Sequence, residues 1–365
     1  MIITVKQLAI IRPKEIKIEN ILMRMNGCAV EIKIVTRTDW PSFSNIASTI
    51  CKAIRPICAC TVQDWKTATP GGYILFIDTV HAESLKFLEK ILLKSNVVFY
   101  GTTEGMSLLD PKSLAVAKRA TIVAVSNFVK QMLEEIGVPV AGVLHHALDM
   151  EDKDVDPHSC KKWKMRTEGK AVVLTISANH PRKGLELLLE AYRAVEQKVE
   201  DTFLIIHSQQ HGYCDLDKEA KKSGIRRFHF TNRFGEMRQQ EINALYKICK
   251  VYVQPSLSEG FGLPIIEAFR FNKPVIAVDA PPFNEIIKHR KSGILVPPTD
   301  IRWHNFENKV NFKMHNYSAE DLADAIIECI SNKVLYTRMR TNILREKHNW
   351  DAQKLYPKLL DYFKR

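Results

Sequence analysis

Short apolar segments rich in β-branched residues alternate with helical patterns along most of the chain, and this alternation restricts the fold more than any other feature. In the second half the apolar segments are AVVLTIS (171–177), TFLIIHS (202–208), RRFHF (226–230), VYVQPS (251–256), PVIAVD (274–279) and GILVP (293–297). Short buried strands joined by helices form a parallel sheet that is covered on both faces. The second half therefore predicts a doubly wound, Rossmann-like α/β domain.

The first half of the chain shows the same alternation less regularly. Its apolar segments are MIITVKQLAII (1–11), CAVEIKIVT (28–36), YILFI (73–77), NVVFY (96–100), ATIVAVS (120–126) and AGVLHH (141–146). With 45% hydrophobic and 26% charged residues over 365 positions, each half can bury a core of its own. The sequence thus predicts two Rossmann-like, doubly wound domains that face each other across a cleft.

The domain boundaries follow the composition. A polar, charge-dense stretch lies between the two series, and residues 156–170 are predicted to be a linker. The N-terminal domain then covers residues 1–155 and the C-terminal domain residues 171–345. An aromatic and basic loop at 299–317 interrupts the second series. A helix is predicted over residues 346–365, and its return to the N-terminal domain is left open.

The charge balance favours anionic partners. Lys and Arg exceed Asp and Glu by 53 to 41, for a net charge of +12. Nucleotides, acidic glycans, nucleic acid and anionic membranes all fit such a balance. The excess is spread over both halves, without the basic arm or stripe that marks a nucleic-acid interface. A specific nucleic-acid partner is therefore not expected.

Neither a membrane span nor a metal site is indicated. No apolar run approaches the roughly 20 residues that a membrane helix needs. Lys6 interrupts the apolar opening, and the basic residues follow it, which is the wrong order for a signal peptide. Eight cysteines are scattered without zinc-ligand spacing, as expected of thiols in a reducing compartment. We expect a cytoplasmic protein with no metal, and peripheral contact with a membrane stays open.

Two glutamates and two glycines surround the end of the strand at 251–256. Gly260 and Gly262 precede a helix predicted to begin at Pro264, where a missing N–H costs nothing. Free amides at a helix start suit a diphosphate. Glu259 is expected to point into the cleft. Glu267, one turn inside the helix, is placed to accept two hydrogen bonds from a vicinal diol such as ribose. A generic strand-to-helix turn explains the glycines alone, but not both glutamates.

Further polar residues follow other predicted strands. Lys183 comes just before a helix, where a compact, mobile cation beside free N–H groups suits a diphosphate. Thr103 and Glu104 stand at a strand end in the first half and could contact an acceptor. His145 and His146 are expected to pack at the domain hinge.

The string from Pro255-Ser256 through Glu259-Gly-Phe-Gly-Leu-Pro-Ile-Ile-Glu267-Ala resembles the Glu-x7-Glu signature of family 4 retaining glycosyltransferases, which have the GT-B fold. Further elements of that family's pattern follow in order: Lys273-Pro-Val-Ile-Ala277, Asn284-Glu285-Ile-Ile and Ser292-Gly-Ile-Leu-Val-Pro297. The resemblance is specific across residues 171–298 and extends to 120–150. Members carry a glycine-rich loop after their first strand, where this chain has Ile11-Arg-Pro-Lys-Glu15.

This resemblance implies a nucleotide-sugar donor in the C-terminal domain, an acceptor in the N-terminal domain and no metal. It implies that Glu259 lies against the donor sugar, that Glu267 binds ribose and that Lys183 acts on the diphosphate. The strand-end arginine of the family corresponds to Ser177 here, and Arg182 is the only guanidinium nearby. The remaining implied positions are the donor-binding loop residues Gly260, Phe261, Gly262 and Leu263, and His81, which would face the sugar across the cleft.

The sequence therefore predicts a metal-independent retaining hexosyltransferase that needs no cofactor. It would move a sugar from a nucleotide-diphosphate donor to a glycan, a lipid-linked acceptor or a small molecule. Lys183, the helix-start amides and Arg182 would stabilise the departing diphosphate. Two alternatives stay open: a nucleotide-sugar epimerase of similar fold, and a non-catalytic subunit that binds sugar nucleotides.

Overall fold

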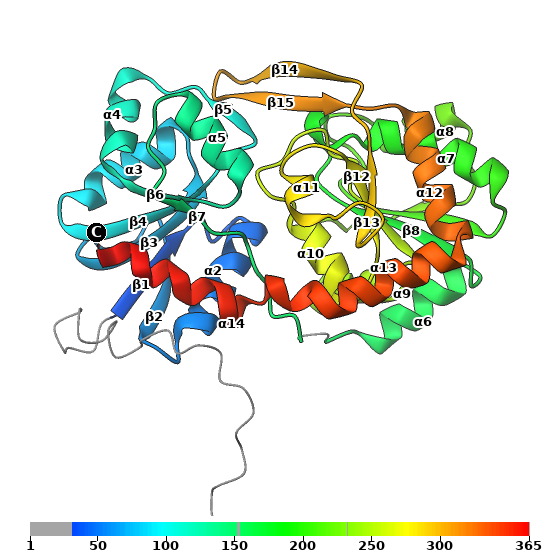
Figure 1. Ribbon diagram of the computed structural model, residues 1–365, viewed down its shortest axis with the longest axis horizontal. Coiled ribbons are helices and arrows are strands. Elements are labelled where there is room, and N and C mark those ends of the chain that lie inside the picture. The colour runs from blue at the N-terminus through cyan, green and yellow to red at the C-terminus, as the bar shows by residue number, and fades with distance from the viewer. Residues whose placement is uncertain (1–30, 152–153, 232, 365) are drawn as a thin grey trace, which may run out of the picture.

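The computed structural model describes residues 31–151, 154–231 and 233–364. These residues form two α/β domains, which lie at the left and right of the molecule in Figure 1. The predicted strand at residues 1–11 and the segment Ile11–Glu15 lie outside the described part of the chain. Within that part, none of the helices combines the length and the apolar character needed to cross a membrane.

The N-terminal domain is built on a parallel sheet with the strand order β2-β1-β3-β4-β6-β7. Its strands are β1 (Glu31–Thr36), β2 (Ala59–Asp64), β3 (Gly72–Thr79), β4 (Ser95–Thr102), β6 (Thr121–Ala124) and β7 (Gly142–Val143). Its helices are α2 (Pro41–Ile54), α3 (Ala82–Leu92), α4 (Pro111–Arg119) and α5 (Asn127–Glu135). Both faces of the central strands are buried, as the continuous apolar runs predicted. The chain places β2 on one side of β1 and β3 on the other, so the strand order reverses between β1 and β3.

The C-terminal domain repeats this plan with the strand order β10-β9-β8-β11-β12-β13, all parallel. Its strands are β8 (Ala171–Ile176), β9 (Thr202–His207), β10 (Phe228–Phe230), β11 (Val251–Val253), β12 (Val275–Val278) and β13 (Gly293–Val296). Its helices include α7 (Leu185–Lys198), α8 (Leu216–Ser223), α9 (Gln239–Ile248), α10 (Leu263–Arg270), α11 (Phe283–Ile286) and α12 (Ala319–Ser331). The predicted pair of doubly wound domains is confirmed. Here the chain order changes direction between β8 and β11, which is where such sheets bind ligands.

Part of the predicted linker at 156–170 is a helix. Residues Pro157–Arg166 form α6, which packs against α9 of the C-terminal domain. Asp156 caps the helix by accepting a hydrogen bond from the backbone N–H of Ser159, and Pro157 occupies the first turn. Trp163 is buried and anchors α6 to the domain. One buried tryptophan in an otherwise polar stretch is therefore enough to make this segment part of the C-terminal domain.

The loop predicted at 299–317 is a β-hairpin that bridges the two domains. Its strands β14 (Asp300–Phe306) and β15 (Val310–Asn316) leave the C-terminal domain after β13. β15 then pairs in antiparallel fashion with β5 (Gly105–Ser107) of the N-terminal domain. In Figure 1 this hairpin crosses the top of the molecule. The interruption of the strand–helix rhythm thus marks a structural connection between the domains.

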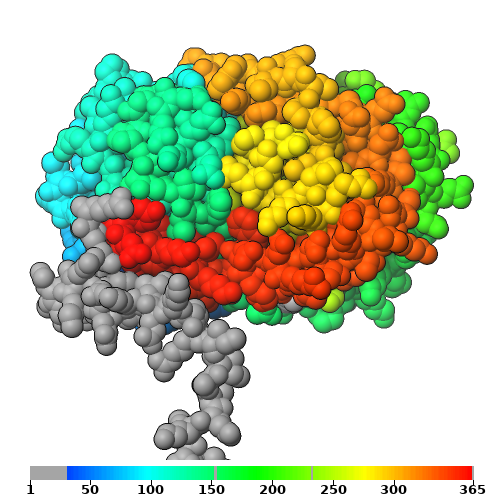
Figure 2. Space-filling view, in the orientation of Figure 1, coloured from blue at the N-terminus to red at the C-terminus, as the bar shows by residue number. Residues whose placement is uncertain are grey.

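The segment that follows α12 returns to the N-terminal domain. It consists of α13 (Lys333–Glu346), η2 (Lys347–Trp350), α14 (Ala352–Leu355) and η3 (Tyr356–Lys364). Figure 2 shows this segment, in orange-red and red, along the lower side of both domains. The hydroxyl of Tyr356 accepts a hydrogen bond from Ala147 N and donates one to Ala147 O, both at 2.9 Å. The hairpin and this segment therefore tie the two domains together along opposite sides.

Candidate functional site

The candidate site lies where the strand order of the C-terminal sheet reverses, between β8 and β11. Its charged side chains are Glu259, Lys183 and Arg182. The two cations belong to the 3-10 turn η1 (Pro181–Lys183) after β8, and Glu259 lies in the loop between β11 and α10. Oε1 of Glu259 accepts a hydrogen bond from Lys183 Nζ at 2.5 Å, and Oε2 accepts one from Arg182 Nη1 at 2.7 Å. Because β8 and β11 are neighbours in the sheet, the fold joins loops that are far apart in the sequence.

The Glu259 carboxylate is buried and held from several sides. Ser256 Oγ and Gln254 Nε2 donate to its Oε1 at 2.9 and 3.0 Å. Burial by itself would raise the pKa of Glu259, but Lys183 and Arg182 outweigh that effect and lower the pKa to about 2. Glu259 is therefore ionised and fixed in position at neutral pH.

Arg182 joins the two domains. Besides Glu259, its guanidinium contacts Glu104 Oε1 of the N-terminal domain at 2.9 Å. The Ser258 hydroxyl also donates a hydrogen bond to the backbone oxygen of Glu104. Burial would lower the pKa of Arg182, but the two carboxylates raise it overall. The sequence suggested that Glu104 could contact an acceptor, which stays a prediction; in the structure its carboxylate forms a partly buried ion pair with Arg182 across the domain interface.

The glycine loop brings the C-terminal domain close to the N-terminal one. A Cβ on Gly260 would lie 2.1 Å from the hydroxyl oxygen of Thr102, so no other residue fits without movement. The carbonyl of Gly260 accepts a hydrogen bond from Ser126 Oγ at 2.7 Å. Phe261 is buried between His145, His146 and Trp350. This loop therefore forms part of the domain interface.

The helix after this loop, α10, begins at Leu263, one residue before the predicted start. Gly262 is its N-cap, with a φ of 105° that favours glycine. Glu267 lies in the second turn, and its Oε2 accepts a hydrogen bond from the hydroxyl of Tyr246 at 2.7 Å. Tyr246 comes from α9 and is fully buried. Sequence reasoning missed Tyr246, because no local pattern links it to Glu267.

Two buried hydroxyls stand at the same edge of the sheet. Ser177 follows β8 and Ser208 follows β9, and neither Oγ has a hydrogen-bond partner within the described part of the chain. Buried polar groups are usually hydrogen-bonded, and both hydroxyls lie at the edge of the sheet where ligands bind, so they are candidates to contact a ligand. Ser177 was predicted from the sequence; Ser208 was missed, although it also ends a predicted strand.

The hairpin covers one side of the Arg182–Glu259 pair. The guanidinium carbon of Arg182 lies 5.7 Å from the ring centre of Phe312 in β15. His180 packs against both Phe306 and Phe312. Burial, with the nearby cations Arg182 and Lys183, lowers the pKa of His180 to about 4. The hairpin thus shields the ion pairs from water and keeps the neighbouring imidazole neutral.

The predicted histidines occupy three different environments. His81 caps α3 and lies 3.3 Å from Arg37, in a group of N-terminal residues separate from Glu259; its role toward a sugar stays a prediction. His145 Nε2 lies 3.0 Å from Glu285 of the other domain. His146 is buried and hydrogen-bonded to Tyr100. His145 and His146 both pack against the interdomain residue Phe261, in line with the expected hinge position.

Glu285 makes a second contact between the domains. Its carboxylate accepts hydrogen bonds from the backbone N–H groups of Asn127 and Phe128, at 2.8 and 2.9 Å. These groups open helix α5, where a negative charge is favoured. Glu285 was part of the quoted sequence pattern, but nothing in that pattern identified its partner.

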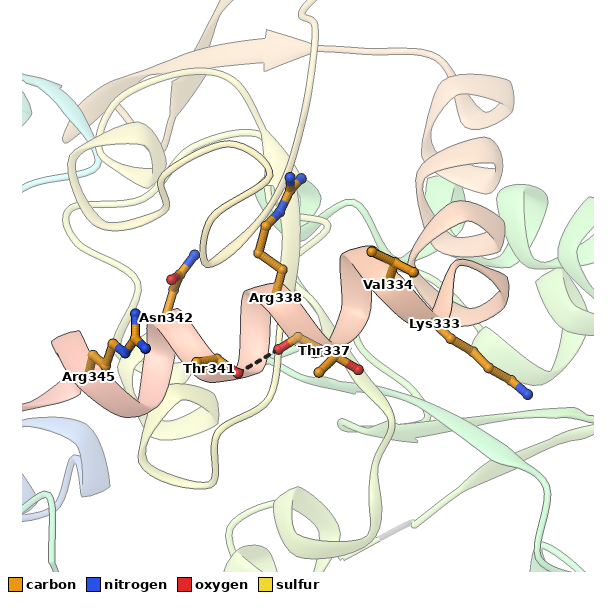
Figure 3. A pocket seen from close by; sticks show the side chains of 7 residues that line it. All are labelled: Lys333, Val334, Thr337, Arg338, Thr341, Asn342 and Arg345. Carbon is orange, nitrogen blue, oxygen red and sulfur yellow. Dashed lines mark hydrogen bonds between the residues drawn. The ribbon is translucent and has the colours of Figure 1, made fainter.

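Neither of two hollows on the described part of the surface contains the ion pairs. One hollow, of about 590 Å³, runs along the outer face of α13. Figure 3 shows the side chains that line it: Lys333, Val334, Thr337, Arg338, Thr341, Asn342 and Arg345. It offers neither a carboxylate nor a histidine, so we assign no chemistry to it. A second hollow, of about 640 Å³, lies beside β5 and the hairpin tip. No group of three His, Cys, Asp or Glu side chains within 31–151, 154–231 and 233–364 could hold a metal ion.

Two Rossmann-like domains whose sheets meet at their carboxyl edges define the GT-B fold of glycosyltransferases. Residues 161–316 match the family model described as glycosyl transferases group 1. Solved structures show the same architecture: a crystal structure of Anabaena Alr3699/HepE with UDP and glucose aligns with a TM-score of 0.68 and 18% identity. The alignment covers 91% of this chain and 98% of that chain.

Curated relatives are also glycosyltransferases by name. An uncharacterized glycosyltransferase of Sulfolobus islandicus rod-shaped virus 1 is 21% identical over 333 residues, which are 88% of this chain and 98% of that protein. The phosphatidyl-myo-inositol mannosyltransferase of Mycobacterium tuberculosis is 29% identical over 191 residues, which are 51% of this chain and 45% of that protein. The chain thus spans the viral protein but less than half of this mannosyltransferase.

Proposed function

We propose that the protein is a retaining glycosyltransferase that moves a hexose from a nucleotide-diphosphate sugar to a hydroxyl acceptor. The observation that carries the proposal is the ionised Glu259, held between Lys183 and Arg182 at the edge of the sheet where ligands bind. This edge belongs to the part of the chain that matches the family model. The names of the relatives support the donor class, since HepE is described with UDP and glucose.

Lys183 and Arg182 are the cations available to a departing diphosphate. In this structure both are paired with carboxylates, so the four charged groups Arg182, Lys183, Glu104 and Glu259 balance one another. A diphosphate would have to draw Lys183 away from Glu259, which its long side chain permits. Negative charge that develops on the leaving oxygen is then stabilised by these two cations.

The reaction needs only the two substrates. The acceptor hydroxyl forms a bond to the anomeric carbon from the face that the diphosphate leaves, the bond from that carbon to the diphosphate oxygen breaks, and the hydroxyl proton passes to the diphosphate. Glu259 stabilises the positive charge that develops on the sugar. Two side-chain cations beside the diphosphate take the place that a divalent ion has in other transferases, so we propose metal independence.

A panel of UDP-, GDP- and ADP-sugars, measured by thermal unfolding in EDTA, tests the donor proposal. One nucleotide series is expected to stabilise the protein, by about 2.7 kcal/mol at a concentration of 100 times its Kd. Glycosyl transfer from that donor is expected to proceed in the same buffer.

Failure of every nucleotide sugar to stabilise the protein would contradict the donor assignment. Activity that vanishes in EDTA and returns with Mg²⁺ would contradict metal independence. Stabilisation without transfer to any acceptor would instead favour the non-catalytic subunit, and a donor epimerised without acceptor would favour the epimerase.

Glu267→Gln is expected to raise the KM for the donor about tenfold and to lower kcat less. The ribose does not change during the reaction, so its contact with Glu267 is present in the ground state and in the transition state alike. Steady-state kinetics with the donor from the panel measure both constants.

Tyr246→Phe is the matched comparison, since it removes only the hydroxyl that donates to Glu267. We expect a smaller increase in KM from it, because the carboxylate remains and loses only its orientation. A Glu267→Gln variant that loses kcat at unchanged KM would place Glu267 at the reacting bond and overturn its assignment to ribose.

A further inference from the structure

The strand order of the N-terminal sheet also reverses at one point, and the donor proposal assigns no ligand to that point. The chain order reverses between β1 and β3, and Arg37 follows β1 directly. Asp78 lies at the end of β3, and Asp64 ends β2 on the other side. In a doubly wound sheet this is the position where a ligand binds. The side chains gathered here therefore bear on what the N-terminal domain recognises.

Arg37 is the fixed centre of this group. Its Nε donates to Asp78 at 2.9 Å, and its Nη2 donates to Glu83 at 3.1 Å and lies 3.3 Å from His81 Nε2. Asp78 is only 1% exposed, so the pair is held rigidly. The guanidinium carbon lies 4.2 Å from the ring centre of Trp65 and 5.3 Å from that of Trp40. Both indole rings are thus positioned by one buried ion pair.

Trp40 presents a large aromatic ring to solvent. It is 49% exposed, and it stacks on Phe43 with ring centres 5.8 Å apart and an angle of 12° between the planes. A half-exposed tryptophan that stacks on a neighbouring ring offers a flat apolar surface to a ligand. Beside it, the indole N–H of Trp65 is buried without an acceptor among the residues that the structure describes.

The charges around the two rings exclude an anionic ligand. Six charged side chains surround them, two cations and four carboxylates: Arg37, Lys66, Asp39, Asp64, Asp78 and Glu83. The carboxylate of Glu83 is largely exposed and can accept hydrogen bonds from hydroxyl groups. A neutral ligand with an apolar face and many hydroxyls fits this surface, whereas a phosphate does not.

We propose that Trp40, backed by Arg37 and Trp65, binds the acceptor and that the acceptor is a neutral glycoside. One C–H face of a sugar ring lies on the indole of Trp40, and hydroxyls of the sugar donate to the exposed carboxylate of Glu83. This assignment rests on the proposed transferase function, whose acceptor it specifies. Trp40 is a binding residue for the acceptor and makes no contact with the donor.

Binding of neutral disaccharides to the full chain tests the proposal without any turnover. Maltose, cellobiose, chitobiose and mannobiose serve as probes, observed by saturation-transfer NMR and titrated by calorimetry. At least one is expected to bind, and Trp40→Ala is expected to weaken it about tenfold, while Trp40→Phe keeps most of the affinity. Trp303→Ala is the matched control, because Trp303 is 48% exposed but belongs to the hairpin, and it should change nothing.

The nucleotide-sugar panel on the same variants separates this proposal from the donor assignment. Trp40→Ala should keep the full stabilisation by the donor and should raise the KM for the acceptor while kcat stays within about threefold. If no disaccharide binds, or if Trp40→Ala binds as tightly as the unmodified protein, the acceptor assignment is overturned even where the donor binds. Loss of donor stabilisation in Trp40→Ala would likewise overturn it.

Discussion

Replacing Glu259 by glutamine is expected to lower kcat by at least about 100-fold and to destabilise the fold by about 3–5 kcal/mol. The carboxylate is the shared partner of Lys183 and Arg182, and both cations are largely buried. An amide leaves Lys183 facing a neutral group, and it removes the charge that stabilises a positive sugar. Denaturant unfolding and donor kinetics on one preparation measure both effects.

The pH dependence of stability provides a second check on Glu259. Its pKa is about 2 in the folded protein and about 4.3 in an unfolded chain, so the ionised form favours folding. That contribution is complete above the unfolded pKa and is lost as the pH falls toward 2. The difference in unfolding free energy between the parent and Glu259→Gln should therefore shrink below about pH 4.

Glu241→Gln is the matched control for both measurements. Glu241 also has a pKa lowered to about 2, because of backbone and side-chain hydrogen bonds from Arg238 and Arg233. Glu241 lies on α9 and is largely buried, but Arg233 and Arg238, the cations that pair with it, are exposed. We expect unchanged kcat from this variant. An equal loss of kcat in both variants, or full kcat in Glu259→Gln, would refute the role given to Glu259.

Lys183→Ala is expected to lower kcat by about two orders of magnitude, the usual effect of removing one donor to a developing charge. Arg182→Ala should cost a comparable factor, because Arg182 is the guanidinium that reaches the same carboxylate. Single-turnover measurements with saturating donor report the chemical step directly.

The Glu104→Gln variant separates the effect of Arg182 on the reaction from its effect on the domain interface. It leaves both cations in place and removes only the partner of Arg182 in the N-terminal domain. We expect a loss of kcat below about tenfold from this variant. An effect under twofold from Arg182→Ala would show that Arg182 serves the domain interface alone.

The fold and the C-terminal site were accessible from the sequence because their signals are local. A short apolar run predicts each strand. Glu259 and Glu267 lie close together in the sequence, around a single strand-to-helix loop. The position of Lys183 could also be predicted, since it stands next to the helix that follows β8. Each of these inferences needs only residues that are neighbours along the chain.

The contacts between the domains could not be predicted in this way. The pair Arg182–Glu104 joins residues that are 78 positions apart, and Glu285 reaches Asn127 over 158 positions. Nothing in a window around either residue specifies such a partner, because the pairing depends on how two complete domains dock. The group around Arg37 was missed for a related reason. Trp40 follows β1, Trp65 follows β2 and Asp78 lies near the end of β3, and only the sheet order brings them together.

The return of the chain after α13 has a consequence for the order in which the protein folds during synthesis. Tyr356, Leu359, Leu360 and Phe363 are buried against the N-terminal domain, yet they follow the whole C-terminal domain in the chain. The ribosome releases the N-terminal sheet first, at a stage when one of its apolar surfaces has no cover. The strands of the C-terminal sheet, β8 to β13, all precede these four residues in the chain. The N-terminal domain therefore gains these buried side chains only after the whole C-terminal sheet has been synthesised.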